Sequence, residues 1–174
     1  MESIRGSADG ENYEILIRME SDDKASLALT PKLREHLGTQ VFVGSADGYA
    51  AIGRHFTYLS ALASGQWVWI FNDDMTIASR DGGWDTKLAQ VPKHGYFVEP
   101  QTHKLNRSTY PNDPRCGAPA LIRNCWSQFG ITELPASLDY RIPERLEKVG
   151  WKPWFLDGVT IWHDRDEAEI RRRK

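Results

Sequence analysis

The most informative part of this sequence is one run in its first half, Ala61-Leu62-Ala63-Ser64-Gly65-Gln66-Trp67-Val68-Trp69-Ile70-Phe71-Asn72-Asp73-Asp74. Residues 67–71 are continuously apolar, which is typical of a central strand buried on both faces. The residues before them favour a helix with Gly65 as its C-terminal cap. The run therefore predicts a helix, a buried strand and an acidic turn in succession.

The same alternation extends toward the N-terminus. Residues 13–19 and 41–43 favour strands, and residues 26–36 favour a helix between them, unless Pro31 begins a shorter helix capped by Thr30. Residues 49–64 favour a long helix, because one face collects its apolar side chains, Ile52, Phe56, Leu59 and Ala63. Strands that alternate with helices predict an α/β fold with a mostly parallel sheet flanked by helices. Ligands of such sheets bind at the carboxyl ends of the strands.

The second half of the chain is less regular. Helices are expected over residues 84–88, 124–129 and 143–149, the last with Pro143 in its first turn. Strands are expected over 96–98, 118–122, 154–156 and 159–162, and a polar loop over 101–115. The length of 174 residues, without a repeat or linker, fits a single domain over residues 1–174.

The composition excludes several classes of protein. Lys and Arg number 22 against 24 Asp and Glu, a net charge of −2, whereas nucleic-acid-binding proteins show a basic excess. No apolar run is long enough to span a membrane, and the N-terminus has no signal-peptide core. Two cysteines are too few for a disulfide framework. These features favour a cytoplasmic protein.

Four positions have the chemistry of a site. Asp73 and Asp74 end the apolar strand, and paired carboxylates attract Mg²⁺ or Mn²⁺. His163 ends another predicted strand, where an imidazole can add a further ligand. Asp139 precedes the last predicted helix and can act as a general base. Each also fits a plain structural role, as a polar turn, a surface histidine or a helix-capping acid.

A phosphate site is suggested at the start of the long helix. Gly48 provides turn chemistry, and Arg54 can clamp phosphate beside a helix N-terminus. The sequence has neither a Gly-x-Gly-x-x-Gly fingerprint nor a Gly-Lys-Ser/Thr phosphate loop, which disfavours two large nucleotide-binding families.

Taken together, residues 13–75 resemble the family-2-like glycosyltransferases of the GT-A fold, which is Rossmann-like. Residues 13–18 and the acidic turn at 21–23 look like the family's nucleotide-binding strand and turn, and residues 48–54 look like its glycine-led helix start. Residues 61–74 match its run of alanine, glycine, apolar strand and DXD-like acidic motif, here beginning with Asn72. The match is looser beyond residue 75, where residues 117–123 resemble the strand after the acceptor loop.

The resemblance implies a metal-dependent, inverting hexosyltransferase that moves a sugar from a nucleotide-diphosphate sugar to an acceptor hydroxyl, such as that of a glycan. Residues 1–75 would form the nucleotide-sugar-binding half and residues 76–174 the acceptor side. Asp74 and His163 would hold Mn²⁺ or Mg²⁺, and Asp139 would be the catalytic base. The donor would be bound by Asp23, Gly48, Arg54, Asn72 and Asp73.

One departure from the family concerns the N-terminus. The usual first strand, which is central in the family's sheet, has no counterpart, since residues 1–12 are polar and contain glycine. Its loss would expose the edges of neighbouring strands, and these would pair directly or be covered by a second copy in a homo-oligomer. An alternative function is therefore a catalytically silent GT-A-like domain that binds a nucleotide, a glycan or another chain. A third hypothesis is a metal-dependent phosphohydrolase that uses Asp73, Asp74 and His163.

Overall fold

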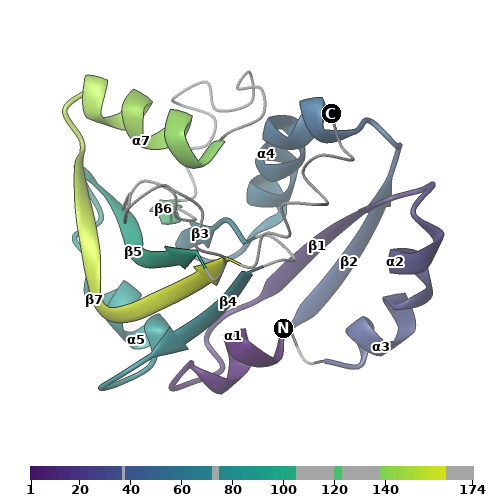
Figure 1. Ribbon diagram of the computed structural model, residues 1–174, viewed down its shortest axis with the longest axis horizontal. Coiled ribbons are helices and arrows are strands. Elements are labelled where there is room, and N and C mark those ends of the chain that lie inside the picture. The colour runs from purple at the N-terminus through teal and green to yellow at the C-terminus, as the bar shows by residue number, and fades with distance from the viewer. Residues whose placement is uncertain (37, 72–74, 105–119, 123–137, 164–174) are drawn as a thin grey trace.

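Two sheets flanked by helices form the described part of the chain in a computed structural model (Figure 1). The structure describes residues 1–36, 38–71, 75–104, 120–122 and 138–163. Its helices are α1 (Glu2–Gly6), α2 (Lys24–Ala28), α3 (Thr30–Arg34), a 3-10 turn η1 (Tyr49–Ala51), α4 (Ile52–Leu62), α5 (Trp84–Ala89) and α7 (Leu138–Lys148). Its strands are β1 (Ile15–Glu20), β2 (Thr39–Gly44), β3 (Trp67–Trp69), β4 (Met75–Ser79), β5 (Tyr96–Lys104), β6 (Ala120–Ile122) and β7 (Lys152–His163). The predicted α/β class is confirmed.

The smaller sheet pairs β1 with β2 in parallel. Helices α2 and α3 supply the crossover that a parallel connection requires. They pack on one face of the sheet, where the Thr30 hydroxyl lies 3.6 Å from the sulfur of Met19. Helix α4 covers the other face, where the rings of Phe42 and Tyr58 meet edge-on with centroids 6.0 Å apart. The sequence predicted this strand–helix–strand unit.

The larger sheet has the order β3-β6-β5-β7-β4, and its pairings are mostly antiparallel. Only β5 and β7 run parallel, while β3–β6, β5–β6 and β4–β7 are antiparallel. The predicted single, mostly parallel sheet is therefore wrong for these strands. The reason is that the regular strand–helix alternation ends at β3, and strands without long crossovers between them can pair antiparallel.

Strand β3 lies at an edge of the described sheet, not at its centre as predicted. Its two faces are nevertheless both covered, because Trp67 and Trp69 pack against one apolar cluster and Val68 against another. The continuous apolar run thus correctly indicated contacts on two faces, although Trp67, Val68 and Trp69 are each only half-buried. It carried no information on how many strands lie to either side.

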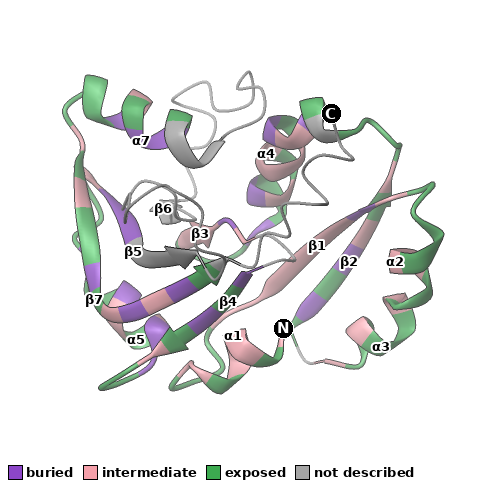
Figure 2. Cartoon of the chain, in the orientation of Figure 1, coloured by how far each residue is buried: buried purple, intermediate pink, exposed green. Residues whose placement is uncertain are grey.

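The two apolar clusters lie on opposite faces of the larger sheet (Figure 2). Successive strand residues point to opposite faces, and Phe97 and Val98 of β5 belong to different clusters, each with no exposed surface. The cluster beneath α5 contains Met75, Ile77, Trp84, Leu88, Val91, Val98, Leu156, Val159 and Ile161. The cluster beneath α7 contains Ile70, Phe97, Ile142 and Leu146.

Helix α1 covers the free edge of β4. The Ile77 N–H donates to the Ser3 hydroxyl at 3.3 Å, and the Ser7 hydroxyl lies 3.4 Å from the Ile77 carbonyl. The Trp84 indole N–H donates to the carbonyl of Ile4 at 2.9 Å, which fixes the helix over the core. Covering an edge in this way prevents pairing with another strand. The sequence did not predict this helix.

Several element boundaries differ from the sequence prediction. The predicted helix over 26–36 is two short helices, and Pro31 lies in the first turn of α3, as the alternative prediction had it. Thr30 is not the cap that this alternative expected, because it is the first residue of α3 and Leu29 is in the cap position without a side-chain hydrogen bond. Helix α4 ends at Leu62, and Gly65 is not its cap, because Ala63 is already extended at φ −62° and ψ 137°. The following turn is held by Glu14, whose carboxylate accepts the N–H of Ser64 at 2.6 Å.

The C-terminal elements are longer than predicted. Strand β5 continues to Lys104, into the predicted loop, and the two late strands are one strand, β7. Gly158 lies inside β7 at φ +69°, a left-handed conformation that glycine adopts without strain. The predicted helix over 124–129 lies outside the described residues.

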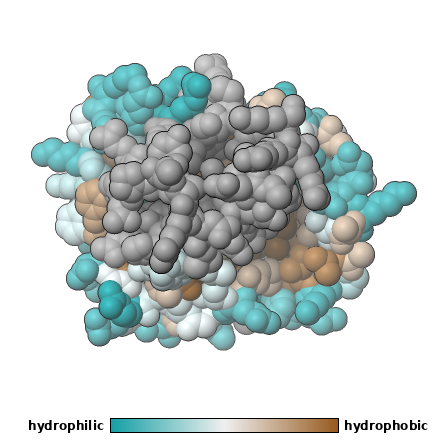
Figure 3. Space-filling model, in the orientation of Figure 1, coloured by the Kyte–Doolittle hydropathy of each residue, from teal (hydrophilic) through white to brown (hydrophobic). Residues whose placement is uncertain are grey.

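The surface of the described residues is mostly hydrophilic on the face shown in Figure 3, with apolar surface gathered over the smaller sheet. Across the described ranges, no helix is both long enough and apolar enough to cross a membrane.

Candidate functional site

Three elements that carry predicted site residues meet in the apolar cluster beneath α7. Ile70, two residues before Asn72, packs with Ile142 and Leu146 of α7. Ile52 of α4 packs against the same cluster. The end of β3, the start of α4 and helix α7 are therefore held together by one core. The sequence predicted Arg54, the acidic motif and the base Asp139 on or next to these same three elements.

The backbone of His163 lies beside the residue that follows the acidic motif. In the β4–β7 pairing, His163 is the register partner of Met75, and opposite residues in antiparallel pairs have Cα atoms about 4.5–5.5 Å apart. Asn72, Asp73 and Asp74 themselves lie outside the described residues. The observed pairing is thus between His163 and Met75, the residue that follows Asp74 in the chain, although many residues separate the two strands in sequence.

Among the described residues, no three His, Cys, Asp or Glu side chains form a group that could hold a metal ion. The acidic motif at 72–74 is not among those residues. The predicted metal site therefore stays a prediction.

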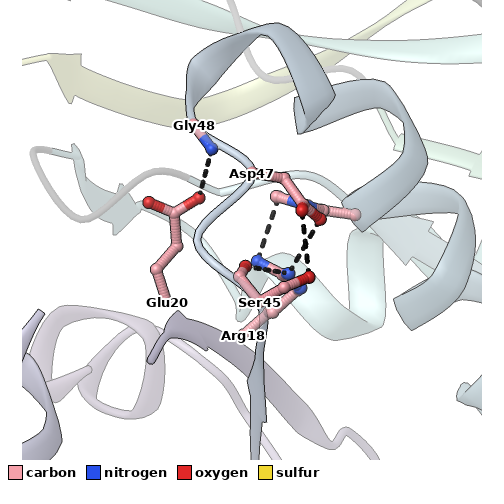
Figure 4. A network of polar contacts seen from close by, with 6 residues as sticks. Arg18, Glu20, Ser45, Asp47 and Gly48 are labelled. Carbon is pink, nitrogen blue, oxygen red and sulfur yellow. Dashed lines mark hydrogen bonds and ion pairs between the residues drawn. The ribbon is translucent and has the colours of Figure 1, made fainter. Parts of the chain in front are cut away.

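A network of polar side chains lies at the carboxyl ends of β1 and β2 (Figure 4). Arg18 donates from Nη2 to the carbonyl of Ser45 at 2.8 Å, and the same nitrogen lies 3.5 Å from a carboxylate oxygen of Asp47. Its Nη1 lies 3.2 Å from Nδ1 of His55. The Ser45 hydroxyl donates to Asp47 at 2.9 Å, and Nε2 of His55 lies 3.4 Å from the other Asp47 oxygen. We refer to Arg18, Ser45, Asp47 and His55 as the Arg18 cluster.

The Arg18 cluster assigns the tautomer of His55. A guanidinium has donors but no acceptor, so Nδ1 of His55 must accept the hydrogen bond from Arg18. The proton of the neutral ring is then on Nε2, from which it donates to Asp47. The histidine therefore bridges a cation and an anion through its two different nitrogens.

The environment of Asp47 stabilises its charged form. The hydrogen bond from Ser45 is the largest cause, followed by the one from His55, and the charges of Arg18 and Arg54 act in the same direction. Together they hold the pKa of Asp47 below its usual value, although partial desolvation opposes them. The carboxylate is thus ionised over the whole neutral range.

Gly44, the last residue of β2, makes room for Arg18. A Cβ at this position would lie 2.7 Å from Nη2 and 3.1 Å from Cζ of Arg18. Such contacts are closer than carbon and nitrogen atoms tolerate, so any larger residue would displace the guanidinium. The Arg18 cluster therefore requires glycine at position 44, although Gly44 makes no side-chain contact of its own.

Gly48 forms the turn into η1 and α4. Its φ of +69° is in the left-handed region, and a Cβ there would meet no atom within 4 Å. The requirement for glycine is therefore one of backbone conformation. Its N–H donates to a carboxylate oxygen of Glu20 at 2.8 Å, which joins the end of β1 to the start of the helix (Figure 4).

Two further predicted donor residues, Asp23 and Arg54, are among the described residues. Asp23 follows β1 and caps α2, since its two oxygens accept the N–H and the hydroxyl of Ser26 at 3.1 and 2.6 Å. These bonds lower the pKa of Asp23, and a carboxylate has further lone pairs for a ligand hydroxyl. Arg54 is exposed and makes no hydrogen bond or ion pair with a described residue.

Asp139 lies within the first turn of α7, not before the helix as predicted. The helix begins at Leu138, and Pro143, expected in its first turn, lies in its interior. Proline has no N–H, so position 143 cannot bond to the carbonyl of residue 139.

Sequence reasoning missed Arg18, Asp47 and His55 as site residues. A signal was present, since Arg18 is a cation inside an apolar strand that leads to an acidic turn. The strand period of two places Arg18 on the face opposite Met19. The partners of Arg18 were not predictable, because His55 is 37 residues away in the chain.

Comparison with protein-family models and with curated protein sequences gives no match for this chain. The resemblance to GT-A glycosyltransferases therefore rests on the residues quoted above.

Proposed function

We propose that this chain is a metal-dependent glycosyltransferase that moves a sugar from a nucleotide-diphosphate sugar to an acceptor hydroxyl. The observation that supports it most is the pairing of His163 with Met75, directly after the acidic motif. An interaction of Asp74 with His163 was expected from the sequence resemblance alone. The pairing supports the proposal because ligands from distant segments can share a cation only where their backbones approach each other.

The second support is the common core beneath α4, the end of β3 and α7. In a displacement at an anomeric carbon, the donor, the metal and the base must act at one place. The three elements proposed to carry them are packed on the same apolar side chains, Ile52, Ile70, Ile142 and Leu146.

The roles follow from the chemistry of each side chain. Asp139 takes the proton of the acceptor hydroxyl. The oxygen of that hydroxyl bonds to the anomeric carbon as the bond from this carbon to the diphosphate oxygen breaks. Arg54, an exposed cation, and the turn at Gly48 bind the diphosphate, while Asp23, Asn72 and Asp73 bind the nucleoside side of the donor. Carboxylate and imidazole ligands suit Mn²⁺ or Mg²⁺, which, when bound, offsets the charge on the leaving diphosphate.

Substitution of Asp74 tests the metal assignment. We expect Asp74→Ala to abolish both Mn²⁺-dependent binding of the nucleotide and sugar transfer, because a ligand of the cation is lost. Asp157→Ala is the matched control, since Asp157 is an exposed aspartate in the middle of β7, away from the end that carries His163. Titration calorimetry would measure binding, and unchanged Mn²⁺-dependent binding by the Asp74 variant would disprove its role.

Substitution of Asp139 separates binding from chemistry. We expect Asp139→Asn to bind the donor as the wild type does and to lose transfer, because the amide cannot take the acceptor's proton. Transfer would be followed by release of the nucleoside diphosphate in the presence of acceptor. Transfer at the wild-type rate would remove Asp139 as the base.

A second candidate function is a catalytically silent domain that binds a nucleotide, a glycan or another chain. It is favoured by the separation of the two sheets, since β1 pairs with no described strand of the larger sheet. A second copy of the chain would then cover β1. This candidate predicts nucleotide or partner binding without transfer, and without any effect of Asp139→Asn.

A further inference from the structure

The Arg18 cluster joins three parts of the chain that approach the proposed donor site. Arg18 comes from β1, Ser45 and Asp47 from the turn after β2, and His55 from the first turns of α4. The side chains of Arg18 and His55 are only 11% and 17% exposed, and that of Asp47 is 37% exposed. The cluster is thus a partly buried connection with one side at the surface.

The two arginines of this region differ in availability. The two terminal nitrogens of the Arg18 guanidinium are both engaged within the cluster, Nη1 by His55 and Nη2 by Ser45 and Asp47. Arg54 is exposed, and its charge acts on Asp47. Arg54 therefore has the freedom to bind an anion, whereas Arg18 supports the turn that leads to it.

We propose that His55 is a positioning residue of the donor site, which holds the turn at 45–48 and the start of α4 so that Arg54 meets the diphosphate of a nucleoside diphosphate. The inference rests on the proposed function. Its basis is that His55 neighbours Arg54 on α4 and bonds to both the turn and β1. If this bridge is lost, the first turn of α4, which carries Arg54, loses its side-chain connection to β1 and to the turn at 45–48.

The chemistry of the bridge selects the test variants. Position 55 must accept from Arg18 and donate to Asp47, and a glutamine amide has one acceptor and one donor group. We therefore expect His55→Gln to restore the bridge. His55→Leu has similar bulk without either group, and His94→Leu is a matched control at an exposed histidine.

The experiment is calorimetric titration with UDP, GDP, ADP, CDP and dTDP, each with Mn²⁺, with the tightest binder carried forward to the variants. We expect His55→Leu to weaken its binding about tenfold, the loss of about 1.4 kcal/mol for a hydrogen-bonded bridge. His55→Gln and His94→Leu should bind as the wild type does. Thermal unfolding would establish that each variant is folded at the temperature of titration.

Gly44→Ala supplies an independent variant, because the added Cβ would displace the Arg18 guanidinium without touching His55. It should weaken nucleotide binding to a similar degree. Wild-type affinity in folded His55→Leu, or a His55→Gln variant as weak as His55→Leu, would overturn the positioning role while leaving the proposed function intact. Absence of binding by the wild type to all five nucleotides would overturn the proposed function, and the positioning role with it.

Discussion

At the scale of the residue, the partly buried Arg18 at the ends of β1 and β2 constrains which side chains can surround it. Arg18 needs acceptors, and it finds them in the Ser45 carbonyl, the Asp47 carboxylate and the unprotonated nitrogen of His55. It also needs space, which Gly44 provides. In the sequence, Arg18 is one charged position in a strand. In the fold, it determines the tautomer of His55 and requires a residue without a side chain at position 44.

The lowered pKa of Asp47 predicts a dependence of stability on pH. A carboxyl group whose pKa is lower in the folded than in the unfolded chain stabilises the fold above its unfolded pKa, and this contribution is lost as the pH falls through the folded pKa. For aspartate, whose unfolded pKa is about 3.9, the stabilisation therefore declines as the pH falls toward and below this value. The hydrogen bonds to Asp23 and Asp9 lower the pKa of those groups as well, and they act in the same pH range.

We therefore expect the unfolding temperature to fall between pH 5 and pH 3, and Asp47→Asn to lower it at pH 5 and reduce the later decline. Circular dichroism melts at a series of pH values would measure both effects. Asp157→Asn serves as the control. A decline in Asp47→Asn as steep as in the wild type would show that Asp47 is not one of the groups responsible.

At the scale of the element, helix α7 illustrates what a sequence pattern can and cannot locate. Proline favours a first turn, and that rule placed the start of the helix at Pro143. The helix begins at Leu138, since Ile142 and Leu146 on its inner face are fully buried against Ile70 and Phe97. The apolar contacts stabilise a helix that the proline alone would not indicate.

Leu146 provides the test of this packing. It has no exposed surface, so we expect Leu146→Ala to lower the free energy of unfolding by about 2–5 kcal/mol, through lost burial and the cavity left behind. Val149→Ala on the residue after the same helix is the control, because Val149 is 56% exposed, and surface changes stay within about 0.5 kcal/mol. Chemical denaturation would measure both, and equal effects would contradict the described packing of α7.

At the scale of the whole molecule, the predictable part of the fold is the part built from neighbouring segments. The β1–α2–α3–β2 unit followed from the period of its apolar residues, and the burial of β3 followed from its continuous apolar run. The order of the larger sheet did not, because it depends on pairings such as Met75 with His163 between distant segments. Helix α1 was missed because its role depends on the edge of β4, a strand the sequence reading did not identify.

The candidate site divides in the same way. The acidic motif, His163 and Asp139 were predicted as site residues because their residue types follow or precede predicted elements in a familiar order, and these predictions remain to be tested by the variants above. The Arg18 cluster was not recognised, since its members are ordinary residues until the fold brings Arg18 of β1 and His55 of α4 within hydrogen-bonding distance.

The proposed function requires this chain to bind a nucleotide-sugar donor through a divalent cation. Calorimetric titration of the wild-type chain with a panel of nucleotide sugars, with and without Mn²⁺, measures this binding. We expect one nucleotide class to bind, and removal of Mn²⁺ to abolish or greatly weaken its binding. A folded sample that binds none of the panel, or binds equally without the cation, would contradict the proposed function.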